Sequence, residues 1–183
     1  MAILRIITEE NETLRKISKP VGEVTDRIKQ LLDDMKDTLA KAGGVGLAAP
    51  QVGILRRMFI INQGIEEEKD DFVEFIDPEI LSVSGSQNDV EGCLSSPDKY
   101  GYVERPMSVT VRAKDRFGKT FEYTGTELMG RCLSHEYDHL DGILFIDKVT
   151  EYVDPDAEEQ PEQTEKNGKK PPHRRLRRHS GRK

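Results

Sequence analysis

The sequence predicts one domain that combines helices and strands in separate stretches of the chain. Apolar residues recur at helical spacing over residues 24–42 and again from residue 127 to just before Gly142. Runs of β-type composition lie between these two stretches. With 183 residues, the chain suits a single domain and is long enough to build a continuous hydrophobic core.

The first helical stretch carries an apolar face and ends at a pair of glycines. Gly43 and Gly44 are expected to stop the helix, and a glycine-rich connection continues to Gln51. The apolar residues of the face are Val24, Ile28, Leu31, Leu32, Met35, Leu39 and Ala42.

Five short runs are predicted to be strands. The segment Asp115-Arg116-Phe117-Gly118 separates the last two of them and is predicted to be a hairpin turn. The five runs are residues 58–62, 72–76, 80–83, 107–113 and 120–123.

The second helix is expected to begin at Thr124-Gly-Thr-Glu127, which matches a capping-box pattern. Gly142 is the expected residue just after its C-terminal end. Apolar residues recur at helical spacing, at Leu128, Cys132, Leu133, Tyr137 and Leu140. The segment His135-Glu136-Tyr137-Asp138-His139 therefore lies within a partly buried helix.

This segment has the spacing of a metal site. Residues at i and i+4 lie on one face of a helix, so His135 and His139 can bind the same divalent ion. Glu136 is the next residue along and can take a proton from water activated by that ion. Two histidines at this spacing can also be ordinary surface residues, so the interpretation depends on a third ligand.

Cys93 is the better candidate for that third ligand. It lies in Glu91-Gly92-Cys93-Leu94-Ser95-Ser96-Pro97, a turn-like segment that can approach a helix from elsewhere in the chain. Cys132 shares the helix with the histidines but is seven residues before His139, roughly 10.5 Å along the axis. Its side chain also leans toward the helix N-terminus, so Cys132 is more simply explained as a small buried hydrophobic residue.

Two other classes of protein remain open from the residues alone. A longer metalloprotease pattern fits as far as Gly142, but its third histidine position holds Phe145, which cannot bind metal. A structural metal site or an RNA-binding module would need a closed site with a fourth ligand such as Cys132, and would not need Glu136.

Composition indicates an intracellular protein. No apolar run approaches the length of a membrane span, and Arg5 interrupts the short apolar start of the chain. Cys93 and Cys132 are too few for a disulfide framework and are expected to be free thiols. We therefore expect a cytoplasmic protein without a membrane partner.

The last part of the chain differs in character from the rest. Residues 1–150 are expected to form the catalytic domain, and residues 151–183 an acidic and then basic tail that is mostly disordered. From Lys166 to Lys183 the chain has nine Lys or Arg and no Asp or Glu, whereas the preceding residues carry a net charge of −15. The tail is predicted either to contact ribosomal RNA through phosphates or to be a solvated segment that pairs with the acidic stretch beside it.

Three motifs, in this order, resemble those of the peptide deformylases. They are Gly44-Val-Gly-Leu-Ala-Ala-Pro-Gln51, Glu91-Gly-Cys-Leu-Ser95 and His135-Glu-x-Asp-His139-Leu-x-Gly142. The resemblance covers roughly residues 1–150. It implies an α+β fold with antiparallel or mixed sheets packed around the motif helix. The implied reaction is removal of the N-terminal formyl group from formyl-methionyl nascent polypeptides, with release of formate.

The resemblance also implies a role for each matching residue. Cys93, His135 and His139 would bind one divalent metal ion, Fe²⁺ by expectation, with Zn²⁺, Ni²⁺ or Co²⁺ able to take its place. Glu136 would transfer the proton, while the Gln51 amide and the Leu94 N–H would donate to the formyl oxygen. The substrate-binding residues would be Gly44, Val45 and Gly46 along the peptide backbone, and Glu91, Gly92, Leu128 and Cys132 around the methionine side chain.

Two positions depart from the family pattern. Ser134 stands where many relatives have Gln, and Arg131 stands where an apolar residue is common. We expect the first to alter the support of the helix and the second to make the pocket rim more polar, with the reaction unchanged.

Overall fold

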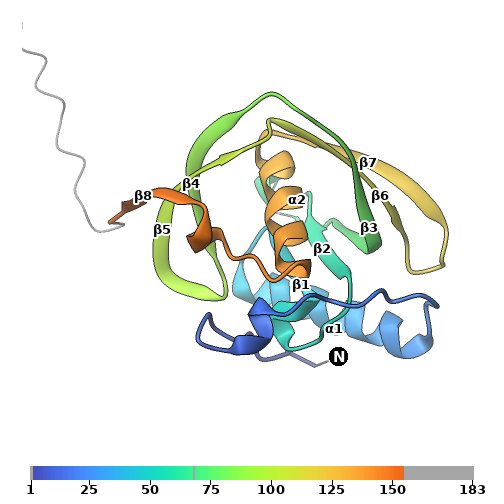
Figure 1. Cartoon of the computed structure of the whole chain (residues 1–183). Helices are drawn as coiled ribbons and strands as arrows, with labels where there is room; N and C mark the ends of the chain where they lie inside the picture. Colours follow the sequence, from blue (N-terminus) through green and yellow to red (C-terminus); the bar gives the residue numbers. More distant parts are fainter. Residues whose placement is uncertain (1, 68, 155–183) are drawn as a thin grey trace, which may run out of the picture.

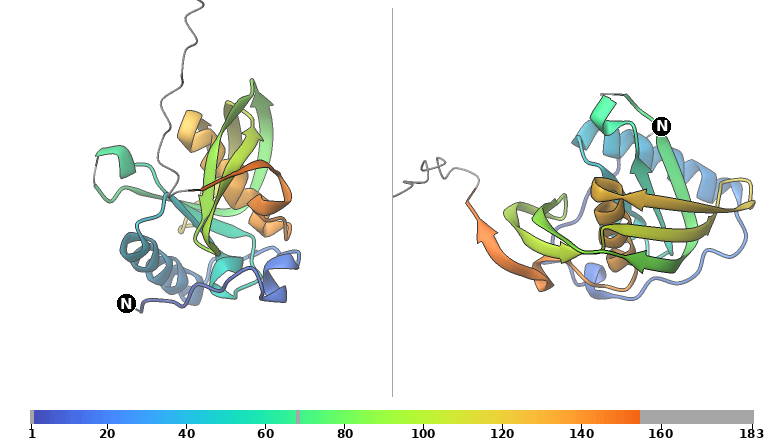
Figure 2. Two further views of the ribbon diagram at one scale, coloured as in Figure 1. Left: turned by 90° about the vertical axis from the view of Figure 1, so that its left-hand side faces the viewer. Right: turned by 90° about the horizontal axis from the view of Figure 1, so that it is seen from above.

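The computed structural model describes residues 2–67 and 69–154. Two antiparallel sheets enclose a central helix, α2, which runs from Glu127 to Leu140 (Figure 1). Seen from above, α2 lies between the two sheets (Figure 2). The expected α+β fold, with antiparallel sheets around the motif helix, is confirmed. Within the described residues, no helix is both long and apolar enough to span a bilayer.

The larger sheet has five strands within the described residues, in the order β1-β2-β3-β6-β7. Helix α1 covers one part of it, and α2 packs against the opposite side. The elements are α1 (Asp26–Ala42), β1 (Gly46–Ala48), β2 (Met58–Asn62), β3 (Phe72–Ser84), β6 (Ser108–Lys114) and β7 (Thr120–Thr126).

The smaller sheet has three strands in the described part of the chain, in the order β4-β5-β8. They are β4 (Gln87–Cys93), β5 (Ser96–Arg105) and β8 (Val149–Val153). Four short 3₁₀ helices complete the described elements: η1 (Glu12–Arg15), η2 (Ala49–Val52), η3 (Ile65–Glu67) and η4 (Phe145–Asp147).

Strand β2 explains how the core is divided. All five of its residues are buried, because both faces of the sheet are covered at this point. Phe59 and Ile61 face the cluster around α2, which also contains Phe75 and Leu133. Met58 and Ile60 face the other cluster, which contains the buried face of α1. Because successive side chains of β2 point to opposite faces of the sheet, this one strand contributes to both hydrophobic clusters.

The expected helix and strands appear with several corrections. Residues 72–76 and 80–83 belong to one strand, β3, whose register shifts between Ile76 and Glu79 and between Ile80 and Ser82. The strands β4, β5 and β8 were not predicted as strands, because their sequences are largely polar and one face of them is exposed. The segment 91–97, predicted to be turn-like, is two strand ends joined at Leu94 and Ser95.

The ends of the two helices test the local predictions. Gly43 closes α1 with a φ of +72°, and Gly142 follows α2 with a φ of +72°, as expected of both glycines. After α2, the N–H of Ile143 donates to the Asp138 carbonyl at 3.0 Å, and the N–H of Gly142 donates to that of His139 at 3.3 Å. The predicted hairpin turn is also confirmed, since Gly118 N–H donates to Asp115 O at 2.9 Å.

The predicted capping box at Thr124–Glu127 is wrong. Thr124 and Thr126 belong to β7, where Thr126 lies opposite Ser108 of β6. The helix begins directly at Glu127, and Thr126 makes no side-chain capping bond. Pairing between β6 and β7 therefore holds the backbone extended up to the first residue of α2.

The expected domain boundary after residue 150 falls inside β8. This strand pairs with β5, for example Tyr152 with Gly101, so the described fold continues at least to Val153. The remainder of the expected tail, residues 155–183, lies outside the described residues.

The aromatic core between the large sheet and α2 is expected to carry much of the stability. Phe75 lies with its ring centroid 4.8 Å from that of Phe59 and 5.5 Å from that of Tyr123. Phe75→Ala should lower the free energy of unfolding by about 3–5 kcal/mol, measured by urea denaturation of the metal-free protein.

The control is Phe117→Ala, at the tip of the β6–β7 hairpin, where the side chain is 82% exposed. Its loss should change the free energy of unfolding by less than about 0.5 kcal/mol. Equal effects of the two substitutions would contradict this assignment of the core.

Candidate metal centre

Helix α2 presents the two histidines, and the end of β4 presents the cysteine. His135 and His139 are one helical turn apart, with ring centroids 5.0 Å from each other, and both are buried. Cys93 Sγ lies 3.3 Å from His139 Nε2. One ligand atom from each of Cys93, His135 and His139 lies within 4.8 Å of the other two. The third side chain predicted from the sequence is thus brought to the two histidines.

This donor set fits a divalent transition metal. A thiolate and two neutral imidazoles are ligands that zinc and iron accept, and three protein ligands leave one position open for catalysis. Donor atoms around one tetrahedral ion lie about 3.3–3.7 Å apart, and the 3.3 Å between Cys93 Sγ and His139 Nε2 falls in this range. Burial lowers the pKa of His139 well below its usual value, which favours the neutral imidazole that binds metal.

Cys132 lies elsewhere in the same cavity. Its sulfur is not part of the convergent group formed by Cys93 and the two histidines among the described residues. A Cβ placed on Gly46 would come within 2.7 Å of Cys132 Sγ and 2.5 Å of Glu136 Oε1. Cys132 and Glu136 therefore pack against the backbone of β1, which only a glycine at position 46 permits. The closed four-ligand site that includes Cys132 is not the arrangement observed.

Glu136 is a buried acid without a full set of partners. Its Oε2 atom has no hydrogen-bond partner in the described part of the chain. Burial raises the pKa of Glu136 to about 7. A carboxyl group in such an environment can both accept and return a proton near neutral pH.

Glu91 does more than line the pocket, which was its expected role. It lines the cavity, but its carboxylate is held by other side chains. Oε2 lies 3.1 Å from His135 Nδ1, and Arg105 donates to both carboxylate oxygens at 2.9 and 3.1 Å. Burial opposes ionisation of Glu91, but the hydrogen bonds from His135 and Arg105 prevail and lower its pKa to about 2.

Gln51 is oriented by the backbone of β1. Its Oε1 accepts a hydrogen bond from Ala48 N–H at 2.8 Å, which directs the amide nitrogen the other way. That nitrogen lies 3.5 Å from Cys93 Sγ and 3.3 Å from Ser95 Oγ. Gln51 therefore presents its amide N–H groups beside the thiol.

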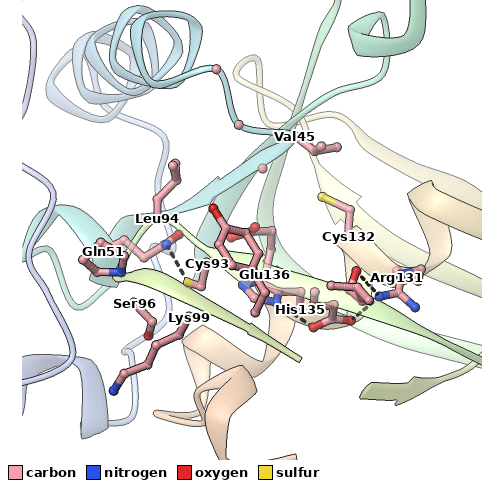
Figure 3. Close-up of a pocket in the computed structure, with 18 of the residues that line it drawn as sticks. Val45, Gln51, Cys93, Leu94, Ser96, Lys99, Arg131, Cys132, His135 and Glu136 are labelled. Carbon is pink, nitrogen blue, oxygen red and sulfur yellow. Dashed lines mark hydrogen bonds and ion pairs between the residues drawn. The ribbon is translucent and has the colours of Figure 1, made fainter. Parts of the chain in front are cut away.

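A cavity of about 490 Å³ is lined by Gln51, Glu91, Cys93 and Glu136, among other residues. In Figure 3, Cys93, His135 and Glu136 lie near its centre, with Gln51 and Leu94 on one side and Cys132 and Arg131 on the other. All the substrate-binding residues expected from the sequence line it: Gly44, Val45, Gly46, Glu91, Gly92, Leu128 and Cys132. Strand β1 is the last strand of its sheet among the described residues, where its second edge has no strand partner and can accept an added strand.

Several residues of the site were missed by sequence reasoning. The cavity is also lined by Val90, Ser96, Pro97, Asp98, Lys99 and Tyr100, which the unpredicted pairing of β4 with β5 brings there. Arg105 was missed as well, and its position in a polar strand gave no sign that it would be buried. Asp138 lies within the recognised motif and binds Arg105.

The two departures from the family pattern are both buried. Ser134 Oγ donates to the Gly130 carbonyl of its own helix at 3.0 Å. Arg131 donates to the carbonyls of Asp89 and Val90, each at 3.1 Å, and lies 3.5 Å from Glu91. Arg131 thus fastens β4 to α2 while it lines the cavity.

Comparison with known proteins agrees with this geometry. The chain is 51% identical to the peptide deformylase of Caldicellulosiruptor bescii over 170 residues, which are 93% of this chain and 98% of that protein. It is 52% identical to the peptide deformylase of Alkaliphilus metalliredigens over 149 residues, which cover 81% and 98% of the two chains. The crystal structure of a peptide deformylase from Legionella pneumophila matches with a TM-score of 0.78 at 45% identity, covering 81% of this chain and 87% of that one.

The sequence model of the polypeptide deformylase family matches residues 3–154, which include the cysteine, both histidines and the glutamate of the site. With this match and these relatives, the chain belongs to the polypeptide deformylase family.

Proposed function

We propose that Glu136 transfers the proton in this deformylase and that Cys93, His135 and His139 hold its single metal ion. The observation that carries the proposal is the buried Glu136 carboxylate, with one oxygen unpartnered among the described residues, in the same cavity as the three convergent donors. By family resemblance the expected ion is Fe²⁺, and the same donors suit Zn²⁺, Ni²⁺ or Co²⁺.

The reaction follows from membership of the family. The chain is a metal-dependent hydrolase that removes the N-terminal formyl group from nascent polypeptides. When bound, a divalent metal supplies Lewis acidity, which makes water more acidic and polarises a carbonyl. The products of hydrolysis of the formyl-methionyl end are formate and a free α-amine.

In the proposed mechanism, Glu136 acts first as a base and then as an acid. Its carboxylate accepts a proton from the attacking water, and the resulting carboxyl group donates that proton to the leaving α-amine. The raised pKa of Glu136 suits both steps, because neither protonation state is strongly favoured near neutral pH.

Gln51 and Leu94 are proposed to stabilise the formyl oxygen as it gains negative charge. The Gln51 amide nitrogen is held beside Cys93 by the bond from Ala48, and Leu94 follows Cys93 directly in the chain. Donors fixed in place before the reaction lose little energy to reorganisation, and one such donor is worth about 3–4 kcal/mol in comparable sites.

The free edge of β1 is proposed to bind the substrate backbone. Gly44, Val45 and Gly46 line the cavity and offer backbone groups for an added strand. The methionine side chain would enter between Gly92 of β4 and Leu128 and Cys132 of α2. Glu91 belongs to this wall mainly through its backbone, because Arg105 and His135 hold its carboxylate.

We also propose that the enzyme works in the cytoplasm and that its basic segment, residues 166–183, contacts ribosomal RNA. Nine Lys or Arg without an acidic residue are suited to phosphate contacts, which weaken as salt rises. This segment lies outside the described residues, so the support comes from its composition and from the nascent-chain substrate of the family.

Loss of the proposed proton carrier should slow the reaction without removing the metal. Glu136→Gln should lower kcat for formyl-Met-Ala-Ser by at least about 100-fold, because the amide cannot accept the proton. Formate release by anaerobically purified, Fe²⁺-loaded protein measures the rate, and elemental analysis measures the metal. Glu122→Gln, on the exposed part of β7, is the control and should keep the full rate. Full activity in Glu136→Gln would refute the assigned role.

The proposed ligands predict which cysteine is required for metal. Cys93→Ser should lose most of the bound metal after dialysis, since a weaker oxygen donor replaces the thiolate. Cys132→Ala should retain one metal ion per chain, because its sulfur lies outside the convergent group. The reverse pattern of metal content would show that the wrong sulfur has been assigned.

Deletion of residues 166–183 should abolish salt-sensitive association with ribosomes. The full chain should sediment with ribosomes at low salt and be released as salt is raised, whereas the shortened chain should stay in the supernatant. Deformylation of a short peptide should be equal for both chains. Unchanged sedimentation of the shortened chain would dismiss the proposed contact.

A further inference from the structure

Arg105 is a charged residue in the interior of the protein. It lies at the end of β5, and its side chain is only 2% exposed. A guanidinium in such a place must be fully hydrogen-bonded, because an unpaired buried charge is very costly. Its partners are two acidic side chains, Glu91 of β4 and Asp138 of α2.

The bond to Glu91 has the geometry of a two-pronged fork. Nε of Arg105 donates to Oε1 at 2.9 Å, and Nη2 donates to Oε2 at 3.1 Å. Such a fork fixes the plane of the carboxylate as well as its position. The remaining nitrogen, Nη1, donates to Asp138, which precedes His139 in α2. One guanidinium therefore holds β4, β5 and α2 together.

The fixed carboxylate in turn contacts a proposed metal ligand. Oε2 of Glu91 lies 3.1 Å from Nδ1 of His135. A carboxylate that accepts the guanidinium fork can only accept from the imidazole too, so in the neutral ring that metal binding requires, the hydrogen is on Nδ1. The lone pair is then on Nε2, the ring nitrogen left to bind a metal.

We propose that Arg105 is a positioning residue for the metal centre, acting through Glu91 on the tautomer and orientation of His135. Arg105 itself belongs neither to the three convergent donors nor to the residues that line the cavity. This inference rests on the proposed ligand role of His135. It gives Glu91 a task in metal binding in addition to its place in the cavity wall.

The alternative is that the ion pair only holds the three elements together. A purely structural role would lower stability but leave the affinity of the folded protein for metal unchanged. Metal affinity of the folded protein is therefore the quantity to measure, together with the thermal unfolding temperature of the same sample.

The test uses metal-free protein titrated with Co²⁺ against a chromophoric chelator under anaerobic conditions. Arg105→Gln should weaken Co²⁺ binding by about 10- to 100-fold, the usual effect of losing a group that orients a metal ligand. Arg112→Gln is the matched control. Arg112 also pairs with a glutamate, Glu122, at 3.1 Å, but its side chain is 48% exposed and lies on β6. The Co²⁺ affinity of the Arg112→Gln protein should stay within about twofold of that of the unsubstituted protein.

Glu91→Gln keeps the size of the side chain and decides the question if Arg105→Gln does not fold. It should weaken Co²⁺ binding by about 10-fold, because a neutral amide lacks the negative charge that holds the hydrogen on Nδ1 of His135. The double substitution Arg105→Gln with Glu91→Gln should bind Co²⁺ no more weakly than the weaker single variant, because both act through one hydrogen bond.

Folded Glu91→Gln or Arg105→Gln protein with unchanged Co²⁺ affinity would overturn the inference, whatever its unfolding temperature. Failure of the proposed metal site has a different signature. In that case Co²⁺ added to the unsubstituted protein would give no thiolate-to-metal charge-transfer band.

Discussion

The site depends on how β4 is held against α2. Cys93 is the last residue of β4, and the two histidines lie on α2, so the three donors meet only if the strand and the helix keep one relative position. Arg105 and Arg131 maintain it from inside, through Glu91, Asp138 and two carbonyls of β4. Both arginines are buried, so moving their partners away would leave an unpaired charge in the interior, which costs much free energy.

Gly46 is the second residue on which the geometry of the site depends. Strand β1 passes so close to α2 that a Cβ there would overlap the Glu136 carboxylate. The same close approach buries Glu136 and raises the pKa of its carboxyl group, while the outer edge of β1 has no strand partner in the described part of the chain. A single close contact thus links the proposed acid–base group with the proposed binding edge.

Much of this arrangement could be predicted because its signals are local or motif-like. The helical spacing, the glycines that end both helices and the spacing of His135 and His139 all depend on neighbours in the sequence. Cys93 could be selected because Cys132 is poorly placed on the helix and because the ordered motifs match a family. Strands β4, β5 and β8 could not be predicted, since their polar residues are exposed on one face, and β8 in addition pairs with the distant β5. The Arg105 ion pairs also depend on that pairing and had no separate signal.

X-ray absorption spectroscopy of the metal-loaded protein tests the central claim most directly, because it reports the atoms bound to the ion. If Cys93, His135 and His139 hold the metal, a zinc-loaded sample should show one sulfur at about 2.3 Å and two imidazole nitrogens at about 2.0–2.1 Å. A first shell of oxygen and nitrogen alone, or one with two sulfurs, would contradict the site described here.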